Sequence, residues 1–127
     1  MGESRKYDIT VTVRPQYLAD QSDETAGRYV FAYHVSIINT GTEVAQLMTR
    51  HWIINEADGK TQEVRGQGVV GEQPKLRPGE GFEYHSGVAL NSPVGTMRGS
   101  YHFVAEDGSA FDAPIEEFVL SVPRILH

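Results

Sequence analysis

Apolar side chains recur at every second position along much of this chain, and this period of two restricts the fold more than any other feature. The longest such set runs from Tyr29 through Phe31, Tyr33 and Val35 to Ile37. Successive side chains of a β-strand point to opposite faces of its sheet, so the set predicts a strand with one buried face. The chain shows no amphipathic helical period, so β-structure is expected to dominate.

Turn signals divide the rest of the chain into further short strands. Asp58-Gly59 is typical of a tight hairpin turn. The last predicted strand, roughly residues 110–122, changes phase between Ile115 and Phe118, which predicts a bulge or a break. We therefore expect an all-β fold, an immunoglobulin or fibronectin type III-like β-sandwich of about seven to eight antiparallel strands.

The length and composition predict one domain and exclude several functional classes. The chain has 127 residues, no cysteine and a net charge of −6. We expect a single domain over 1–127, with an ordered core over about 7–125. The acidic balance and the scattered Lys and Arg argue against a nucleic-acid partner. No secretory segment and no run of roughly 20 apolar residues is present, so we expect a cytoplasmic protein without membrane contact.

The phrase RGQGVVGE contains the spacing G-x-G-x-x-G at Gly66, Gly68 and Gly71. In dinucleotide-binding proteins this motif opens a helix whose amides hold the pyrophosphate. Here Pro74 and Pro78 exclude a helix, and no Gly-Lys-Ser/Thr ends the loop. The sequence therefore favours a structural role, in which glycines allow a tight turn or a close backbone approach.

A helix-free anion site is a second hypothesis for this loop. Successive amides can form an anion-binding nest, and nearby Lys and Arg side chains would add positive charge. Interleaved glutamates such as Glu72 and Glu80 would cancel much of that charge. The candidate anion-binding residues are Gly66, Gly68, Gly71, Arg65, Lys75 and Arg77.

Four of the five histidines fall on the predicted outer face of a strand, out of phase with inward aromatic residues such as Trp52. In a fibronectin-type strand order, the second predicted strand neighbours the fifth and the third neighbours the sixth. We therefore expect His34 to face His85, and His51 to face His102. Two imidazoles form at best a weak transition-metal site, so solvated surface histidines are the alternative.

The chemistry-bearing residues do not form a recognisable catalytic pattern. The sequence has no G-x-S-x-G nucleophile motif and no H-x-x-x-H metal pair. Without a linked nucleophile, acid–base pair or metal-ligand spacing, we expect neither enzyme activity nor a cofactor.

Several phrases resemble the ApaG family: YVFAYHVSIINTG, TRHWIINEADG, VRGQGVVGEQPKLRPGEGFEYHSG, and the pair PVGTMRGSY and VPRILH. The likeness extends from about Tyr7 to the C-terminus, and the family's glycine motif falls on Gly66, Gly68 and Gly71. The resemblance implies a fibronectin type III-like sandwich, a loose association with cobalt and magnesium tolerance, and no established enzymatic activity. Related eukaryotic domains occur in protein-binding settings: the substrate-recruiting part of an F-box protein, and a DNA polymerase delta-interacting protein.

From these observations we expect a non-enzymatic protein–protein interaction module. Its partner would bind an exposed sheet edge or the irregular segments 16–28 and 66–81, and exposed edges also allow a homodimer. Two alternatives remain. One is binding of a small anion, pyrophosphate or a nucleotide, at the glycine loop. The other is divalent metal binding through the surface histidines.

Overall fold

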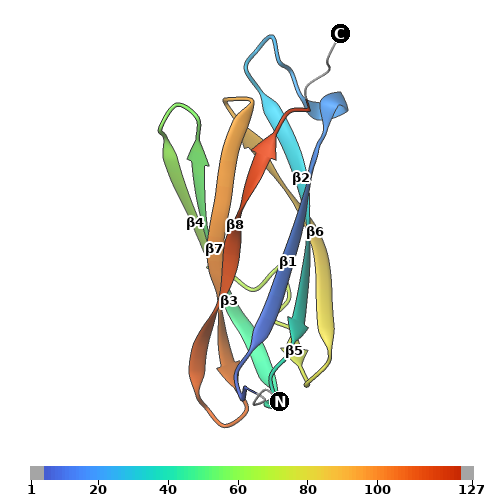
Figure 1. The fold of residues 1–127 in the computed structure, drawn as a ribbon, viewed down its shortest axis with the longest axis vertical. Helices are drawn as coiled ribbons and strands as arrows, with labels where there is room; N and C mark the ends of the chain where they lie inside the picture. Colours follow the sequence, from blue (N-terminus) through green and yellow to red (C-terminus); the bar gives the residue numbers. More distant parts are fainter. Residues whose placement is uncertain (1–4, 124–127) are drawn as a thin grey trace.

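Two antiparallel β-sheets lie face to face in the computed structural model, which describes residues 5–123 (Figure 1). The strands are β1 (Ile9–Tyr17), β2 (Tyr29–Asn39), β3 (Ala45–Glu56), β4 (Thr61–Gln67), β5 (Lys75–Leu76), β6 (Gly81–Leu90), β7 (Val94–Ala105) and β8 (Ala110–Ser121). One sheet has the order β1-β2-β6, and the other has the order β4-β3-β7-β8 with β5 paired to β3. The predicted all-β sandwich is confirmed.

The inner face of β2 carries the alternating residues from which the fold was predicted. Phe31, Val35 and Ile37 are no more than 1% exposed. From the opposite sheet, Trp52 packs edge-on against Tyr33, with ring centroids 5.4 Å apart. Burying an apolar side chain of this size stabilises the fold by about 1.5–3 kcal/mol. These two inner faces therefore hold the sheets together.

A bulge in β8 lies where the sequence changes phase. Met97 of β7 pairs with Phe118, whereas Gly99 pairs with Ile115, so two residues of β8 lie opposite one residue of β7. The extra residue lets Ile115 and Phe118 both contact the core although their spacing is odd. The predicted irregularity is confirmed.

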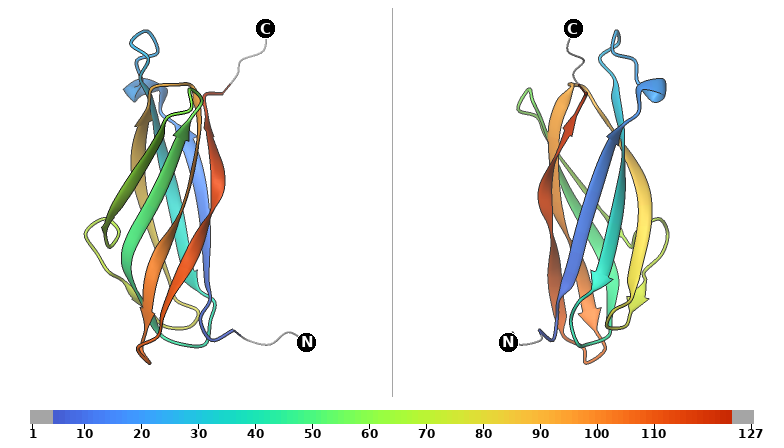
Figure 2. Two further views of the ribbon diagram at one scale, coloured as in Figure 1. Left: turned by 90° about the vertical axis from the view of Figure 1, so that its left-hand side faces the viewer. Right: turned by 45° about the vertical axis from the view of Figure 1, so that its right-hand side comes forward.

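The two long sides of the sandwich differ. On one side, β1 and β8 lie side by side and close the gap between the sheets (Figure 1 and Figure 2). On the other side, β4 and β6 are the edge strands of their sheets, and they are not hydrogen-bonded to each other. The sandwich is therefore left with two unpaired strand edges on this side.

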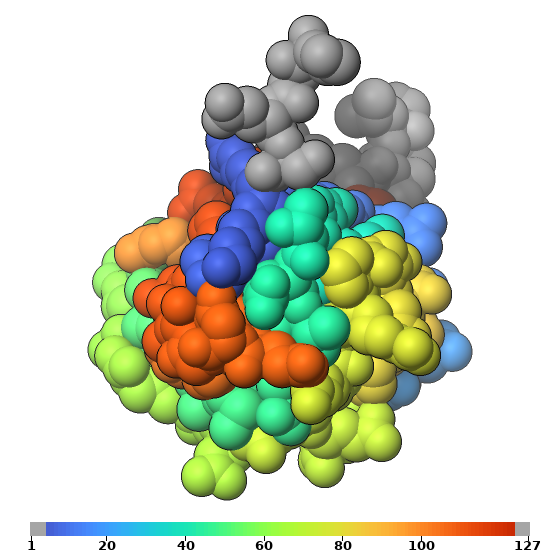
Figure 3. Space-filling model, turned by 90° about the horizontal axis from the view of Figure 1, so that it is seen from below, coloured from blue at the N-terminus to red at the C-terminus, as the bar shows by residue number. Residues whose placement is uncertain are grey.

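Two of the loops at one end of the sandwich are tied together by a buried asparagine. Figure 3 looks at this end, where the loops after β2, before β6 and between β7 and β8 meet. Asn39 is 1% exposed, and its Nδ2 donates to the carbonyls of Glu43 and Leu76. Its Oδ1 accepts from the amide of Gly41. These bonds satisfy a polar side chain that would otherwise destabilise the core.

The two segments predicted to be irregular are partly ordered. Strand β1 continues to Tyr17, and a short 3₁₀ turn, η1 (Ala19–Gln21), follows it. In the 66–81 segment, Gly66 belongs to β4 and β5 provides a two-residue strand. Within residues 5–123, no helix is long and apolar enough to cross a membrane.

Candidate functional site

The first glycine of the G-x-G-x-x-G motif lies on the inward face of β4. Gly66 pairs with Arg50 of β3, and two residues earlier Val64 pairs with Trp52. Because strand side chains alternate, Arg50 shares the inward phase of Trp52. A Cβ added to Gly66 would lie 2.7 Å from Cζ of Arg50. The missing side chain of Gly66 therefore makes room for the guanidinium group.

The rest of the motif is a tight turn. Val70 and Gly71 both have positive φ, 45° and 82°, as the central residues of a type I′ turn do. The amide of Val69 donates to the carbonyl of Glu72 at 2.8 Å, and the amide of Glu72 donates back at 3.0 Å. These two amides donate to carbonyls within the turn, so they are not part of an anion-binding nest that faces solvent.

Arg50 binds this loop from the inside. Its Nη1 donates to the carbonyls of Gln67 and Gly68 at 3.0 and 2.8 Å. The amide of Gly68 donates to the carbonyl of Met48, which fixes the loop to β3. The glycine motif thus surrounds an arginine of the same chain. Arg50, Trp52 and Ile54 lie at alternate positions of one strand, so the sequence already placed Arg50 on the same face as the two apolar residues. The sequence interpretation missed this signal.

The cations proposed for an anion site are paired with carboxylates. Arg65 lies 3.9 Å from Glu63, and Lys75 lies 3.8 Å from Glu106. Arg65 lines a hollow with Gly66, whereas Lys75 lines other hollows. The structure therefore does not gather the predicted cations around the glycine loop.

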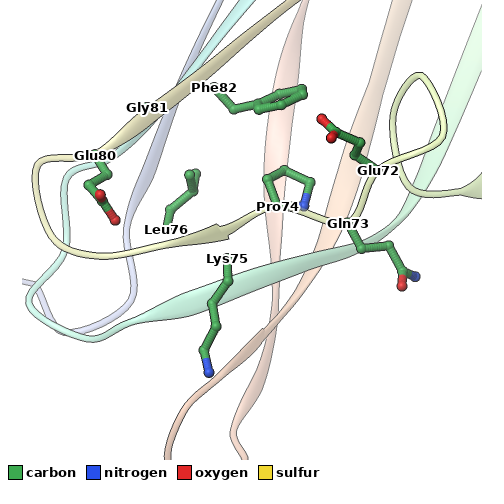
Figure 4. A pocket seen from close by; sticks show the side chains of 8 residues that line it. All are labelled: Glu72, Gln73, Pro74, Lys75, Leu76, Glu80, Gly81 and Phe82. Atoms are coloured by element: carbon green, nitrogen blue, oxygen red, sulfur yellow. The ribbon is translucent and has the colours of Figure 1, made fainter.

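A shallow hollow of about 470 Å³ follows the glycine loop, between residues 72–76 and the start of β6 (Figure 4). Its rim carries the carboxylates of Glu72 and Glu80, while the Lys75 side chain points away from the ring of Phe82 (Figure 4). The backbone amide and side chain of Arg77 donate to Glu80 and lower the pKa of its carboxyl. This hollow is consequently acidic and a poor place for a phosphate.

Three tyrosine hydroxyls lie inside the sandwich near Arg50. The hydroxyls of Tyr84 and Tyr101 form a hydrogen bond at 2.5 Å. Burial raises the pKa of Tyr84 to about 12, and the charge of Arg50 opposes that shift. Burial also raises the pKa values of Tyr101 and Tyr33. These hydroxyls are therefore neutral hydrogen-bonding groups at physiological pH.

A groove of about 280 Å³ opens between the unpaired edges of β4 and β6. Its floor consists of core side chains, and its walls are the two edge strands. The lining residues are Tyr33, Arg50, Trp52, Ile54, Gln62, Val64, Ser86, Gly87, Val88, Ala89 and Met97. Arg50 is the single charged residue among them. The groove is thus mainly apolar, with a cation in its lining.

The structure places one predicted histidine pair together and separates the other. His34 and His85 are register partners, with ring centroids 4.7 Å apart, as expected. Nε2 of His34 also lies 2.9 Å from the carboxylate of Glu83.

The expected pairing of His51 with His102 is wrong. His51 lies opposite Ser100, and His102 lies opposite Thr49. The imidazole of His51 instead lies 2.9 Å from the carboxylate of Glu63 on β4. The imidazole of His102 lies 2.9 Å from the carboxylate of Asp112 on β8. The described part of the chain contains no cluster of three or more His, Cys, Asp and Glu side chains placed to hold a metal ion.

Comparison with known proteins adds the family. The profile of the ApaG domain matches residues 19–105. The chain belongs to the ApaG family. This match includes Arg50, the glycine motif and both edge strands of the groove, so the groove is part of the ApaG domain.

ApaG proteins of several bacteria match over the whole length of this chain. Protein ApaG of Nitrosospira multiformis is 61% identical over 100% of both chains, and so is Protein ApaG of Thiobacillus denitrificans. A crystal structure of a Bordetella pertussis protein described as ApaA superposes with a TM-score of 0.94 at 54% identity. The superposed region covers 97% of this chain and 100% of the Bordetella pertussis chain. This ApaG chain therefore has the same sandwich as a relative solved by crystallography.

Proposed function

We propose that this ApaG protein is a non-enzymatic protein-binding module that takes up an extended segment of a partner along the groove between β4 and β6. The observation that supports this proposal is the open side of the sandwich. Two unpaired strand edges flank a groove whose floor includes the buried side chains of Trp52 and Ile54. An unpaired edge offers backbone amides and carbonyls to an added strand, and adjacent pockets select its side chains.

The chemistry of the groove supports binding in preference to catalysis. Its lining contains no histidine and no carboxylate, so it lacks the usual general acids and bases. The hydroxyl of Tyr33 has a raised pKa because of burial, which makes it a weaker acid. The groove instead offers apolar contact area and hydrogen-bonding groups, which are the components of a recognition surface.

Selection from a library of random linear peptides displayed on phage tests this function. Retained peptides are synthesised and titrated into ¹⁵N-labelled protein. We expect the amide shifts to concentrate in β6 and β4. Shifts confined to the 18–28 loop or to the outer sheet faces would contradict the proposed surface, and so would a failure to retain any peptide.

A pair of lysine variants provides the matched control. Ala89 is exposed on the free edge of β6, and Thr12 is exposed on β1 at the opposite edge of the same sheet. Lysine on an edge strand discourages strand addition. We expect Ala89→Lys to weaken peptide binding at least tenfold, and Thr12→Lys to leave it unchanged.

A second copy of the chain is the other occupant that the free edges allow. Sedimentation of the protein with and without a selected peptide separates the two cases. A dimer that dissociates as peptide binds would identify the groove as a self-association surface.

A further inference from the structure

We propose that the groove selects a partner segment with one acidic side chain, whose carboxylate binds Arg50, and an apolar side chain two positions away. This inference rests on the proposed function, because it names the chemistry of the segment that the groove would hold. Three features of the groove carry it: the donors left over on Arg50, the apolar surroundings of that cation, and the spacing along β4.

Arg50 has hydrogen-bond donors to spare. A guanidinium group has five N–H donors, and the two bonds to the glycine loop both use Nη1. Within residues 5–123, no carboxylate lies within ion-pair distance of Arg50. The same part of the chain has no fully buried side-chain nitrogen without a hydrogen-bond partner. The free donors of Arg50 therefore reach solvent. Arg50 lines the groove and also the hollow beside Gly66 and Arg65.

The surroundings of Arg50 favour a carboxylate over a neutral group. The other lining residues of the groove are uncharged. An ion pair is screened less in such a partly buried apolar site than on the open surface. Tyr33 and Ser86 are register partners across β2 and β6, both are lining residues of the groove, and both carry a hydroxyl. These hydroxyls can donate to a bound carboxylate in addition to the bidentate fork of Arg50.

The spacing of the groove follows from the register of its wall. Arg50 lies opposite Gly66, and Trp52 lies opposite Val64, so the cationic and apolar positions are two residues apart on adjacent strands. An added strand also presents every second side chain to one face. A carboxylate at the Arg50 level therefore places its second neighbour at the level of Trp52 and Val64, where an apolar side chain fits.

The negative charge of the whole protein limits the bound partner segment to a single acidic residue, placed at Arg50. The net charge is −6, and Glu63 and Glu83 lie on the outer faces of β4 and β6. A run of acidic residues would be repelled by these carboxylates. One carboxylate flanked by apolar residues gains the Arg50 contact without that repulsion.

The test uses the peptides selected from the display library. We expect one Glu or Asp to be enriched, with an apolar residue two positions away. Replacing that acid by Gln or Asn in a synthetic peptide should weaken binding to the wild-type protein roughly 10- to 100-fold. This comparison leaves the protein unaltered, so it does not depend on whether an Arg50 variant folds.

Selection on the Arg50→Gln protein gives the reciprocal measurement, after its ¹⁵N spectrum has been checked for a folded sandwich. The acidic preference should disappear while the apolar preference remains. Peptides that shift β6 but bind equally well with Glu or Gln would overturn this inference and leave the proposed function standing. If no retained peptide shifts β6 or β4, both proposals fail.

Discussion

The guanidinium of Arg50 lies against Gly66, in the space that any larger residue at position 66 would fill with its side chain. Arg50 belongs to β3 and Gly66 to the neighbouring β4, and the two are register partners. A cation can occupy this position between the sheets because Gln67 and Gly68 supply carbonyl acceptors. This relationship explains the first glycine of the motif, and the positive φ of Gly68 and Gly71 explains the other two.

Gly66→Ala should destabilise the protein by about 1–3 kcal/mol, because the new methyl group displaces a guanidinium held by two carbonyls. Urea unfolding measures the change in the free energy of unfolding. In an Arg50→Ala background the same substitution should cost little, giving a coupling energy on the order of 1–2 kcal/mol. Gly87→Ala is the control, since its Cβ would make an ordinary 3.4 Å contact. Equal costs in the two backgrounds would show that Arg50 does not require this glycine.

Gly68→Ala should cost more than Gly71→Ala, although both glycines have positive φ, 63° and 82°. Each substitution introduces left-handed strain of about 1–2 kcal/mol. At Gly68 the new Cβ would also collide with the carbonyl of Glu72, whereas at Gly71 nothing lies within 4 Å. We expect a difference of about 1–3 kcal/mol in thermal or urea unfolding. A larger cost at Gly71 would contradict this geometry.

The period of two, together with the turn signals between its runs, predicted the sandwich, because a strand with one buried face alternates apolar and polar side chains. The same period predicted the bulge between Ile115 and Phe118, and together with a fibronectin-type strand order it predicted the contact of His34 with His85. The register of β3 on β7 could not be read in this way. No hairpin joins β3 to β7 or β2 to β6, so no turn fixes either alignment. The assumed partner was right for His34 and wrong for His51, which lies opposite Ser100.

The candidate groove was harder to predict from the sequence than the fold was. Its walls come from β4 and β6, which are not hydrogen-bonded to each other, so no local pattern brings them together. Arg50 was also overlooked because a charged residue is ordinarily assigned to solvent. Its inward position depends on Gly66, sixteen residues later in the chain, and on the carbonyls of the turn that follows.

Pyrophosphate should leave the amide resonances of residues 65–77 unshifted at sub-millimolar concentrations. The amides of Val69 and Glu72 are already bonded within the turn, and the nearby cations are paired with carboxylates. A ¹⁵N–¹H titration with pyrophosphate and then ATP checks this expectation. Saturable shifts in this range that disappear in Arg65→Glu would instead support the anion-binding hypothesis.

Cobalt titration gives the corresponding test of the histidines. With two imidazoles at most in contact, we expect only weak binding, and any Co²⁺ broadening should centre on His34 and His85 rather than on His51. The double variant His34→Gln and His85→Gln is the control. Tight binding that survives this double substitution would locate the metal elsewhere in the protein.

The buried tyrosine pair should make the protein lose stability in alkaline solution. The pKa of Tyr84 is raised from 10.0 to about 12 by burial, so folding favours its neutral form. The resulting stabilisation is fully present below about pH 10 and is lost as the pH rises toward about 12. The loss attributable to Tyr84 is on the order of 2 kcal/mol.

Tyr84→Phe separates this effect from ordinary destabilisation. The variant should lose about 1 kcal/mol at neutral pH, because the hydroxyl of Tyr101 loses its hydrogen bond. Its free energy of unfolding should then fall less steeply than that of the wild type above about pH 10. Ile37→Val, a core substitution costing about 0.5–1.5 kcal/mol, should keep the wild-type slope. Parallel slopes for wild type and Tyr84→Phe would show that the ionisation of Tyr84 is not linked to folding.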